Sequence, residues 1–281
     1  MKGQACKRNP VASHQAPVRY RRSPTPCRRG TNKSSPPHTT GIMSTAGAQA
    51  GFETFDALNI EYEKAYHDNP FKVACVKKAI SMLQPGSRVL DVGCGTGMPV
   101  SQLLSTAGLD VSGFDISPKM VHYAQSRVKG TFVVSDMLEY QPAGQFAGVF
   151  IIFAHLQLSY ADFHTAAYKF TQALQPGGIL ALGQMPADKY VRAETDWDET
   201  KTYVEDYDAP FMGEMLPTLA LSAEGQLEFL RSMGLEIVSN KIDTFHPNNP
   251  KCLPEEQQYI IARRPDDKPL SPPKPLPKTT S

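Results

Sequence analysis

The stretch VLDVGCGTGMPVSQLL, residues 89–104, places three closely spaced glycines between an apolar run and an amphipathic one. An apolar run that stops at glycines predicts a buried strand, and the residues after the glycines predict the opening of a helix. A strand, a glycine turn and a helix N-terminus together form a cradle for an anion or a nucleotide. This feature constrains the fold most, because it predicts the start of a strand–helix–strand unit.

Strand and helix patterns alternate along the chain on both sides of that turn. The predicted strands cover residues 87–93, 111–117, 131–137, 148–156, 177–184, 235–246 and 256–264. The predicted helices cover residues 52–67, 69–83, 98–107, 161–174 and 222–234, and Ser117-Pro118 begins another. This alternation predicts an α/β fold, a doubly wound and mostly parallel sheet with helices on both faces.

Charge is segregated along the chain, although its net value is only +1. Residues 1–50 carry nine Lys or Arg and no acid, whereas residues 51–265 carry 17 basic and 26 acidic residues. An acidic body repels a phosphate backbone, so we expect no nucleic-acid partner. The apolar runs are too short to span a bilayer, and no apolar segment follows the N-terminal basic residues as in a secretory signal. We therefore expect no membrane partner either.

Both ends of the chain have few large apolar residues. Residues 1–50 contain six prolines, and residues 266–281 are rich in Pro and Lys. Such segments cannot bury enough surface to form a core, so we expect a disordered leader and a disordered tail around a domain at residues 51–265. The leader also has the composition of a mitochondrial import signal, but its prolines would break the required helix. A cytoplasmic protein is favoured, and a start at Met43 with an untranslated leader is an alternative.

The five cysteines give no sign of a metal site. They are Cys6, Cys27, Cys75, Cys94 and Cys252, and none forms a C-x-x-C pair. No Cys and His cluster has the spacing of a zinc site. We therefore expect no metal and no disulfide framework.

The spacing of Gly93, Gly95 and Gly97 indicates what the cradle holds. A dinucleotide fingerprint is G-x-G-x-x-G, whereas here the third glycine comes one residue early and Met98 takes its place. Asp91 precedes the turn, and its carboxylate would repel a pyrophosphate but attract an ammonium group. The cradle therefore suits a ligand with an amino-acid head, and the spacing argues against a dehydrogenase.

The segment LDVGCGTG resembles the first motif of the class I S-adenosylmethionine-dependent methyltransferases, an acid followed after one residue by G-x-G-x-G. The segments GFDIS, SDMLEY and ALQPGGILAL follow in order and resemble further motifs of this family. The resemblance covers residues 85–183 well and residues 184–264 loosely, and local segments are similar to fungal small-molecule methyltransferases. It implies a seven-stranded sheet with the last strand inserted antiparallel, and S-adenosyl-L-methionine as cofactor.

The resemblance also implies roles for individual residues. The acid and the three glycines of the first motif would bind the cofactor, and Asp115 would accept hydrogen bonds from both ribose hydroxyls. Ile116 would lie against the adenine face, Asp136 would accept from the adenine amino group, and the Met137 backbone would read the ring edge. The structural alternative is that Asp115 caps a helix, Asp136 stabilises a turn and the glycines form an ordinary tight turn.

Tyr62 and Tyr66 are four residues apart and so share one face of a predicted helix. This helix resembles the segment that closes over the cofactor in the family, which implies that Tyr62 contacts the cofactor. Packing of both tyrosines in the core is the alternative.

His155 follows the fourth predicted strand, together with Gln157. Ligands bind beyond the carboxyl ends of the strands in sheets of this type, so both residues are expected on the rim of the site. A neutral imidazole there could take a proton from a methyl acceptor, which makes His155 the candidate general base. The alternative is a hydrogen bond from His155 to the backbone at the strand end.

A long insertion at about residues 186–217 precedes the last helix. It contains seven aromatic or methionine side chains: Tyr190, Trp197, Tyr203, Tyr207, Phe211, Met212 and Met215. Long loops near a site often act as lids, and these side chains suit an apolar, partly planar acceptor. The alternative is an irregular or helical insertion packed against the sheet edge.

These features predict an S-adenosylmethionine-dependent methyltransferase that moves a methyl group to O, N or S of a small, apolar or aromatic metabolite, as in secondary metabolism. The alternative is a protein of the same fold that binds the cofactor without methyl transfer, as a regulator, a scaffold or a cyclisation catalyst. The sequence leaves open the acceptor and the oligomeric state.

Overall fold

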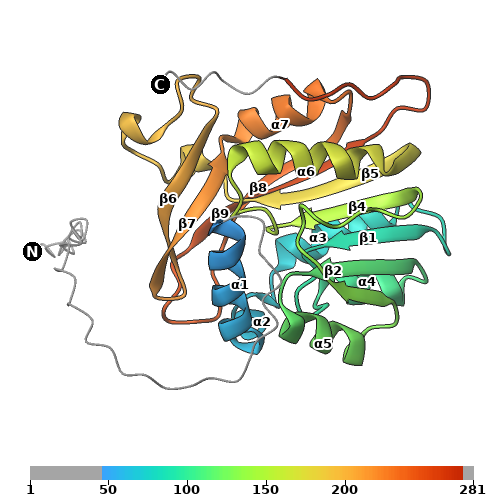
Figure 1. Cartoon of the computed structure of the whole chain (residues 1–281), viewed down its shortest axis with the longest axis horizontal. Coiled ribbons are helices and arrows are strands. Elements are labelled where there is room, and N and C mark those ends of the chain that lie inside the picture. Colours follow the sequence, from blue (N-terminus) through green and yellow to red (C-terminus); the bar gives the residue numbers. More distant parts are fainter. Residues whose placement is uncertain (1–45, 275–281) are drawn as a thin grey trace, which may run out of the picture. The chain divides into compact units, whose positions relative to one another are not determined.

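A single seven-stranded sheet organises residues 46–274, the part of the chain that the computed structural model describes (Figure 1). The strand order is β3-β2-β1-β4-β5-β9-β8. The strands are β1 (Arg88–Val92), β2 (Asp110–Asp115), β3 (Thr131–Val134), β4 (Phe146–Ile152), β5 (Leu174–Gln184), β8 (Glu236–Phe245) and β9 (Glu255–Arg263). β9 is antiparallel to both of its neighbours, and β1 to β5 are mutually parallel. The predicted fold class is confirmed, including the antiparallel last strand.

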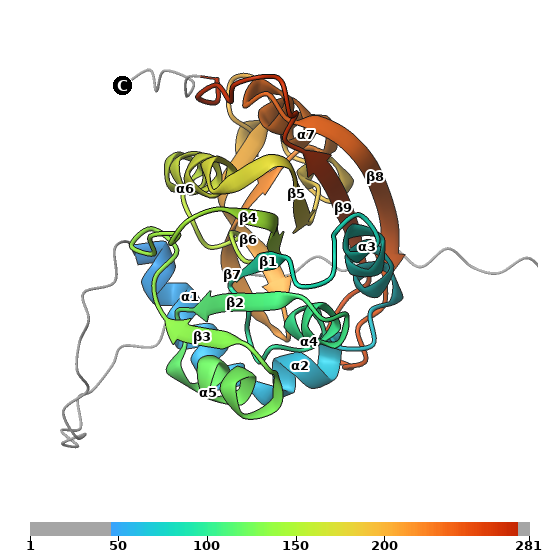
Figure 2. The same ribbon diagram turned by 90° about the vertical axis from the view of Figure 1, so that its right-hand side faces the viewer.

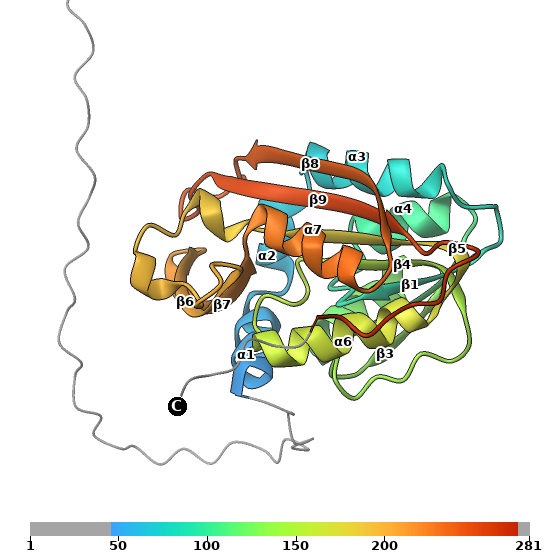
Figure 3. The same cartoon turned by 90° about the horizontal axis from the view of Figure 1, so that it is seen from above.

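Helices cover both faces of this sheet. On one face lie α3 (Pro70–Ile80), α4 (Val100–Thr106) and α5 (Pro118–Arg127), and on the other lie α6 (Tyr160–Gln172) and α7 (Ala223–Ser232). Figure 2 views the sheet end-on, with α6 on one side and α3 and α4 on the other, and Figure 3 shows the same separation from above. The strand order reverses between β1 and β4, which places a crevice at the carboxyl ends of these two strands.

Three helices, α3, α5 and α7, begin where the sequence predicts, because side chains accept hydrogen bonds from their first N–H groups. Asn69 caps α3 and Ser117 caps α5, and each is followed by a proline at the first helical position. Ser222 caps α7 by accepting a hydrogen bond from the Gly225 N–H. These capped starts fix how the helices leave the sheet.

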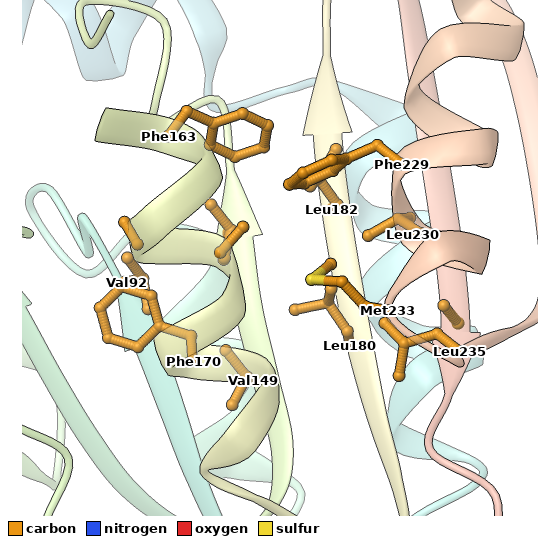
Figure 4. Close-up of a cluster of buried hydrophobic side chains, with 14 of the residues drawn as sticks. Val92, Val149, Phe163, Phe170, Leu180, Leu182, Phe229, Leu230, Met233 and Leu235 are labelled. Atoms are coloured by element: carbon orange, nitrogen blue, oxygen red, sulfur yellow. The ribbon is translucent and has the colours of Figure 1, made fainter. Parts of the chain in front are cut away.

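The core between the sheet and α6 and α7 is built from regularly spaced apolar side chains. Phe163 and Phe170 are one heptad apart on α6 and are both buried. Both rings pack against the sheet in the same cluster as Phe229 of α7 and Met233, which directly follows α7 (Figure 4). This packing holds β4 and β5 rigidly, and the loop after β4 forms part of the site.

Two short helices precede α3 where one was predicted. They are α1 (Ala46–Leu58) and α2 (Ile60–Tyr66), and Asn59 separates them with a positive φ of 32°. Ion pairs attach them to α5: Asp56 to Lys119 at 2.8 Å, and Glu63 to Arg127 at 2.8 Å. Residues 46–50, expected in the leader, belong to α1, and the rest of the predicted leader lies outside the described residues.

The predicted insertion contains a β-hairpin, which the sequence analysis did not anticipate. Its strands are β6 (Tyr203–Phe211) and β7 (Glu214–Leu221), preceded by two short 3-10 turns, η1 (Ala187–Lys189) and η2 (Glu194–Asp196). Met212 and Gly213 form the two-residue turn with φ of 51° and 92°, as such hairpins require. The Leu219 N–H donates to the Leu156 carbonyl at 2.7 Å, which attaches the hairpin to the segment after β4.

The predicted disordered tail differs from the structure over its first part. Residues 266–274 run along α6 and α7, and the Ser271 N–H donates to the Met233 carbonyl at 3.1 Å. His164 hydrogen-bonds the Lys274 carbonyl at 2.7 Å, and Leu270 packs on the core. Residues 275–281 lie outside the described residues. None of the helices in residues 46–274 combines the length and hydrophobicity needed to cross a membrane.

Removal of one core ring tests the packing between α6 and the sheet. Phe170 is fully buried, so Phe170→Ala is expected to lower the free energy of unfolding by about 3–5 kcal/mol through lost burial and a new cavity. Urea unfolding would measure this. Val133→Ala is the control, because Val133 is 43% exposed and should cost less than about 1 kcal/mol. Equal losses in the two variants would contradict the assigned core.

Candidate functional site

A cavity opens at the carboxyl ends of β1 to β4, and we call it the first compartment. Every one of these four strand ends contributes to its lining. The main lining residues are Gly93 and Gly95 after β1, Asp115 and Ile116 from the end of β2, Ser135, Asp136 and Met137 after β3, and Phe153, Ala154, Gln157 and Leu158 after β4. Helices α1 and α2 cover it with Gly51, Phe55 and Tyr62. Most of the predicted site residues therefore lie around one cavity.

The three glycines of the loop after β1 have different roles. Gly93 has a φ of 65°, and a Cβ there would lie 2.5 Å from the Cβ of Ala154. Gly95 has a φ of 54°, and no atom lies within 4 Å of its Cβ position, so it leaves space at the cavity. A Cβ on Gly97 would lie 2.9 Å from Val128 Cγ2. Gly97 therefore allows the loop to pack on α5 and does not line the first compartment.

Asp115 is fixed at the end of β2 by backbone hydrogen bonds. Its Oδ2 accepts from the Gly95 N–H and its Oδ1 from the Ser117 N–H, both at 2.9 Å. Burial raises the pKa of its carboxyl, while these N–H groups act in the opposite direction. Each oxygen has another lone pair that can accept from a ligand. Asp115 thus orders the loop and lines the cavity, whereas the cap of α5 is Ser117 and not Asp115. Hydrogen bonding of Asp115 to a ribose stays a prediction.

Asp136 and Met137 form the far wall of the first compartment. Asp136 Oδ1 accepts from the Leu138 N–H at 2.8 Å, the turn contact that the structural alternative expected. The Met137 carbonyl accepts from Lys169 Nζ at 2.8 Å. Ile116 adds apolar surface to the same lining. This part of the cavity combines a carboxylate with apolar side chains, which suits a flat heterocycle with an exocyclic donor.

A third compartment adjoins the glycine loop and shares Tyr62, Gly93 and Gly95 with the first. Its lining includes a buried carboxyl group, Asp91, and a buried amine, Lys72. Asp91 accepts from Ser101 Oγ at 2.5 Å, and burial raises its pKa to about 7. Burial lowers the pKa of Lys72 to about 8, opposed by Glu255 and Asp91. A buried carboxylate near a buried ammonium complements a ligand that carries both charges.

Sequence reasoning missed Lys72, although one signal was present. It lies in the first turn of α3, beside the capping residue Asn69. A cation at a helix N-terminus is unfavourable to the helix dipole, so its presence there indicates another role.

A second compartment shares Phe55, Tyr62, Phe153 and Gln157 with the first. Its other lining residues are Tyr66, Leu156, Met185, Ala209, Pro210, Phe211, Leu216, Thr218, Glu255 and Gln257. The lining is mostly apolar and aromatic. Glu255 is the one acid among the described residues that line it, and sequence reasoning missed it.

Phe153 separates the first and second compartments in an unusual backbone conformation. Its φ is 59°, a region that a bulky residue rarely adopts. Its ring meets that of Tyr259 edge-on at 5.6 Å between centroids, and Lys72 Nζ lies 5.8 Å from its centroid. Such a conformation persists only where surrounding contacts hold it, often at functional sites. No feature of the sequence predicts it.

The N-terminal helices and the hairpin meet over the second compartment. The Phe211 ring at the hairpin tip lies 5.6 Å from that of Phe55 and 6.0 Å from those of Tyr62 and Tyr66. Tyr62 and Tyr66 share a helix face and stack at 4.9 Å. This contact between distant segments closes the compartment on one side.

Of the seven aromatic and methionine residues in the insertion, the described structure places Phe211 alone in this lining. Tyr203 stacks on Tyr160, Tyr190 packs on Tyr207, and Met215 is 58% exposed. Movement of the insertion as a lid stays a prediction.

His155 differs from the expectation of a rim position. It is fully buried, and its ring stacks on that of Phe163 at 4.2 Å. Neither ring nitrogen has a hydrogen-bond partner among the described residues, and burial lowers the pKa of His155 to about 3. It does not line the three compartments. After the turn at Phe153 the side chain lies in the core under α6, so it is not placed to act as the base.

Comparison with known proteins agrees with this geometry. Residues 89–178 match a family described as a methyltransferase domain. A stretch of 114 residues is 29% identical to the O-methyltransferase resE of Aspergillus sclerotiorum, over 37% of this chain and 42% of that protein. A stretch of 169 residues is 30% identical to the 2-methyl-6-phytyl-1,4-hydroquinone methyltransferase of Synechocystis, over 56% of this chain and 48% of that protein. The matched stretches thus span less than half of either relative.

Solved structures share the fold. The magnesium protoporphyrin IX methyltransferase of Synechocystis PCC 6803, determined with bound SAM, aligns with a TM-score of 0.55 and 17% identity over 80% of this chain and all of that one. The chain therefore shares the fold of this methyltransferase, and its residues 89–178 match a methyltransferase domain. The family match covers residues 89–178, so α1 to α3 precede it, and the hairpin and Glu255 follow it. Residues 46–274 hold no cluster of three His, Cys, Asp or Glu side chains suited to a metal ion.

Two glycine substitutions separate backbone strain from steric conflict in the loop. Gly93→Ala places a methyl group 2.5 Å from Ala154, whereas Gly86→Ala at a similar φ of 79° meets no atom within 4 Å. Gly86→Ala is expected to cost about 1 kcal/mol for the left-handed conformation, and Gly93→Ala at least about 2 kcal/mol more. Chemical unfolding of both variants checks this. Equal costs would mean that the loop moves freely away from β4.

The burial of His155 predicts a specific dependence of stability on pH. Its pKa is about 3 in the folded protein and about 6.5 when unfolded, so the unfolded chain binds more protons between these values. Its contribution to stability is complete above pH 6.5 and is lost as the pH falls toward 3. Relative to His155→Phe, which cannot be protonated, the wild type should lose about 2–3 kcal/mol between pH 7.5 and 4.5.

Urea unfolding at the two pH values measures this difference, and His122→Phe, an exposed histidine on α5, is the matched control. Parallel pH curves for the wild type and His155→Phe would show that the imidazole can be protonated within the folded protein.

Proposed function

We propose that this protein is an S-adenosylmethionine-dependent methyltransferase that transfers a methyl group to O, N or S of a small, largely apolar or aromatic molecule. One observation carries the proposal. The first compartment, which four strand ends line, adjoins the other two, and Tyr62 lines all three. The third compartment supplies a buried cation and a buried anion, and the second supplies a mostly apolar surface.

The residues of the first compartment fit an adenosyl group. Asp115 has unoccupied lone pairs for two adjacent hydroxyls, and a fixed carboxylate is a strong acceptor for them. Ile116 and Met137 supply apolar surface for the faces of a base, and Asp136 is an acceptor for its amino group. The absence of a side chain at Gly95 leaves open the room that a Cβ would fill, because no other atom lies within 4 Å of that position.

The third compartment fits the amino-acid end of the cofactor. The Lys72 ammonium would bind a carboxylate, and Asp91 would bind an ammonium group. Both groups have pKa values shifted by burial toward their neutral forms. A ligand that carries the opposite charges would stabilise the ionised forms of both, so part of the burial cost is offset on binding. When bound, S-adenosylmethionine supplies a methyl group on a positively charged sulfur.

The second compartment fits an acceptor. Its aromatic side chains can pack against a ring, and Phe153 and Tyr62 line the junction with the first compartment. Alignment of nucleophile, methyl carbon and sulfur can lower the activation barrier to such a transfer by a large amount. The contact between Phe211 and the rings of α1 and α2 covers the second compartment on one side, which would limit the access of water to a bound acceptor. The fungal relative is an O-methyltransferase, which supports oxygen among the three acceptor atoms.

The test of this function uses S-adenosylmethionine labelled in the methyl group. The full chain is incubated with it and a panel of small aromatic alcohols, amines and thiols, and S-adenosylhomocysteine is quantified. Production of S-adenosylhomocysteine that depends on the acceptor supports the proposal. Binding of the cofactor without turnover for any acceptor would favour a protein that keeps the fold but transfers no methyl group.

Replacement of Asp115 tests the binding of the ribose. Asp115→Ala should weaken S-adenosylmethionine binding by about 2–3 kcal/mol, because hydrogen bonds to a charged acceptor are lost. Isothermal calorimetry measures the affinity, and circular dichroism shows whether the variant is folded. Asp110→Ala is the matched control, since Asp110 begins the same strand with a side chain that is 65% exposed. Unchanged affinity in a folded Asp115→Ala protein would contradict the assignment.

A further inference from the structure

The direction of β9 places an acid in the second compartment. β9 is antiparallel to β5, so its first residue, Glu255, lies at the edge of the sheet where the parallel strands end. Glu255 is partly buried and lines the cavity together with Tyr66 and Gln257. The functional roles described above leave this carboxyl group unassigned.

A hydrogen-bond network fixes the orientation of Glu255. Asn69 Oδ1 caps α3, so its Nδ2 must be the donor to Gln257 Oε1 at 2.7 Å. Gln257 Nε2 therefore donates to Glu255 Oε2 at 2.8 Å. The Tyr66 hydroxyl donates to Glu255 Oε1. Both oxygens of Glu255 are thus acceptors, each with one lone pair left, as a carboxylate base requires.

We propose that Glu255 is the proton acceptor in methyl transfer and that the second compartment takes a neutral, flat molecule with a hydroxyl group on an aromatic ring. This inference rests on the proposed function. The aromatic lining suits such a ring, and the Glu255 carboxylate disfavours an acceptor that is already an anion. Tyr62 and Phe153, at the junction of the two compartments, would set the ring beside the donor methyl.

The chemistry of a hydroxyl acceptor matches a carboxylate. As the hydroxyl oxygen bonds to the methyl carbon, the carbon–sulfur bond breaks and its electron pair stays on sulfur. The hydroxyl proton passes to a Glu255 oxygen, and the products are a methyl ether, a neutral thioether and a protonated carboxyl. The oxygen becomes strongly acidic as its new bond forms, so even a weak base accepts its proton. A neutral amine would need no base at this stage.

The surroundings of Glu255 support this role. Burial raises the pKa of its carboxyl, while the hydrogen bonds from Tyr66 and Gln257 and the charge of Lys72 act in the opposite direction. A base is most effective when its pKa lies near the working pH. Tyr62 and Cys252 also face this region, and burial raises the pKa of each.

The test compares two phenols that differ in acidity. 2-Naphthol keeps its proton at neutral pH, whereas a large fraction of 4-nitrophenol has lost it. Glu255→Gln is expected to lower kcat for 2-naphthol by about 10²–10⁴-fold. It should change kcat for 4-nitrophenol by less than about tenfold, because the ionised fraction of this phenol has no proton for a general base to remove. The affinity for S-adenosylmethionine, measured by calorimetry, should stay the same.

Two further variants make the comparison decisive. Glu256→Gln changes the next residue, which pairs with Thr244 outside the three compartments, and should leave both rates unchanged. Glu255→Asp keeps the carboxylate but withdraws it by one methylene, and should show an intermediate loss confined to 2-naphthol. It also replaces Glu255→Gln if that variant does not fold.

Each other outcome overturns a distinct claim. Equal losses for both phenols, or a normal rate for 2-naphthol, would exclude Glu255 as the proton acceptor. A wild-type protein that binds S-adenosylmethionine but methylates neither phenol would exclude the proposed acceptor class. A wild-type protein that does not bind S-adenosylmethionine would overturn the proposed function itself and this inference with it.

Discussion

The hydrogen bonds of the Asp115 carboxylate connect the parts of the site to one another. One oxygen holds the glycine loop through Gly95, and the other holds the start of α5 through Ser117. The Ser117 hydroxyl in turn donates to Asp56 of α1 at 2.7 Å, and Lys119 pairs with the same acid. A single partly buried acid therefore couples the loop, a helix N-terminus and the covering helices. Any ligand that changes the hydrogen bonding of Asp115 is coupled to all three.

Local sequence chemistry was enough to predict the succession of strands and helices and the glycine cradle, whereas the resemblance to the methyltransferases implied most other residues of the first compartment. The caps at Asn69, Ser117 and Ser222 and the glycine spacing act within a few residues of the elements they define. The hairpin was missed because polar and apolar residues do not alternate regularly along its strands, and because Met212-Gly213 is not a common turn pair. The three-compartment arrangement depends on contacts between α2, β9 and the hairpin, and no local pattern encodes such contacts.

His155 and Glu255 show why a strand-end rule alone cannot identify a base. His155 does follow β4, in a segment that contributes to the site, as the rule expects. However, after the left-handed turn at Phe153 its ring lies in the apolar core. Glu255 was overlooked because it lies at the start of its strand and not at the end. Only the antiparallel direction of β9 brings the start of that strand to the same edge as the ends of the others. Strand direction, which the resemblance to the family already implied, was therefore the missing step.

The buried charges around Tyr62 explain how methyl and proton transfer would fit together. Lys72 interacts electrostatically with both Asp91 and Glu255, so a change in the charge of one group is felt by the others. In the proposed reaction the ligand loses its positive sulfonium charge when the methyl group leaves. The carboxylate of Glu255 loses its negative charge in the same step, because it takes the proton. The net charge of this low-dielectric region then stays constant, which avoids the cost of an uncompensated buried charge.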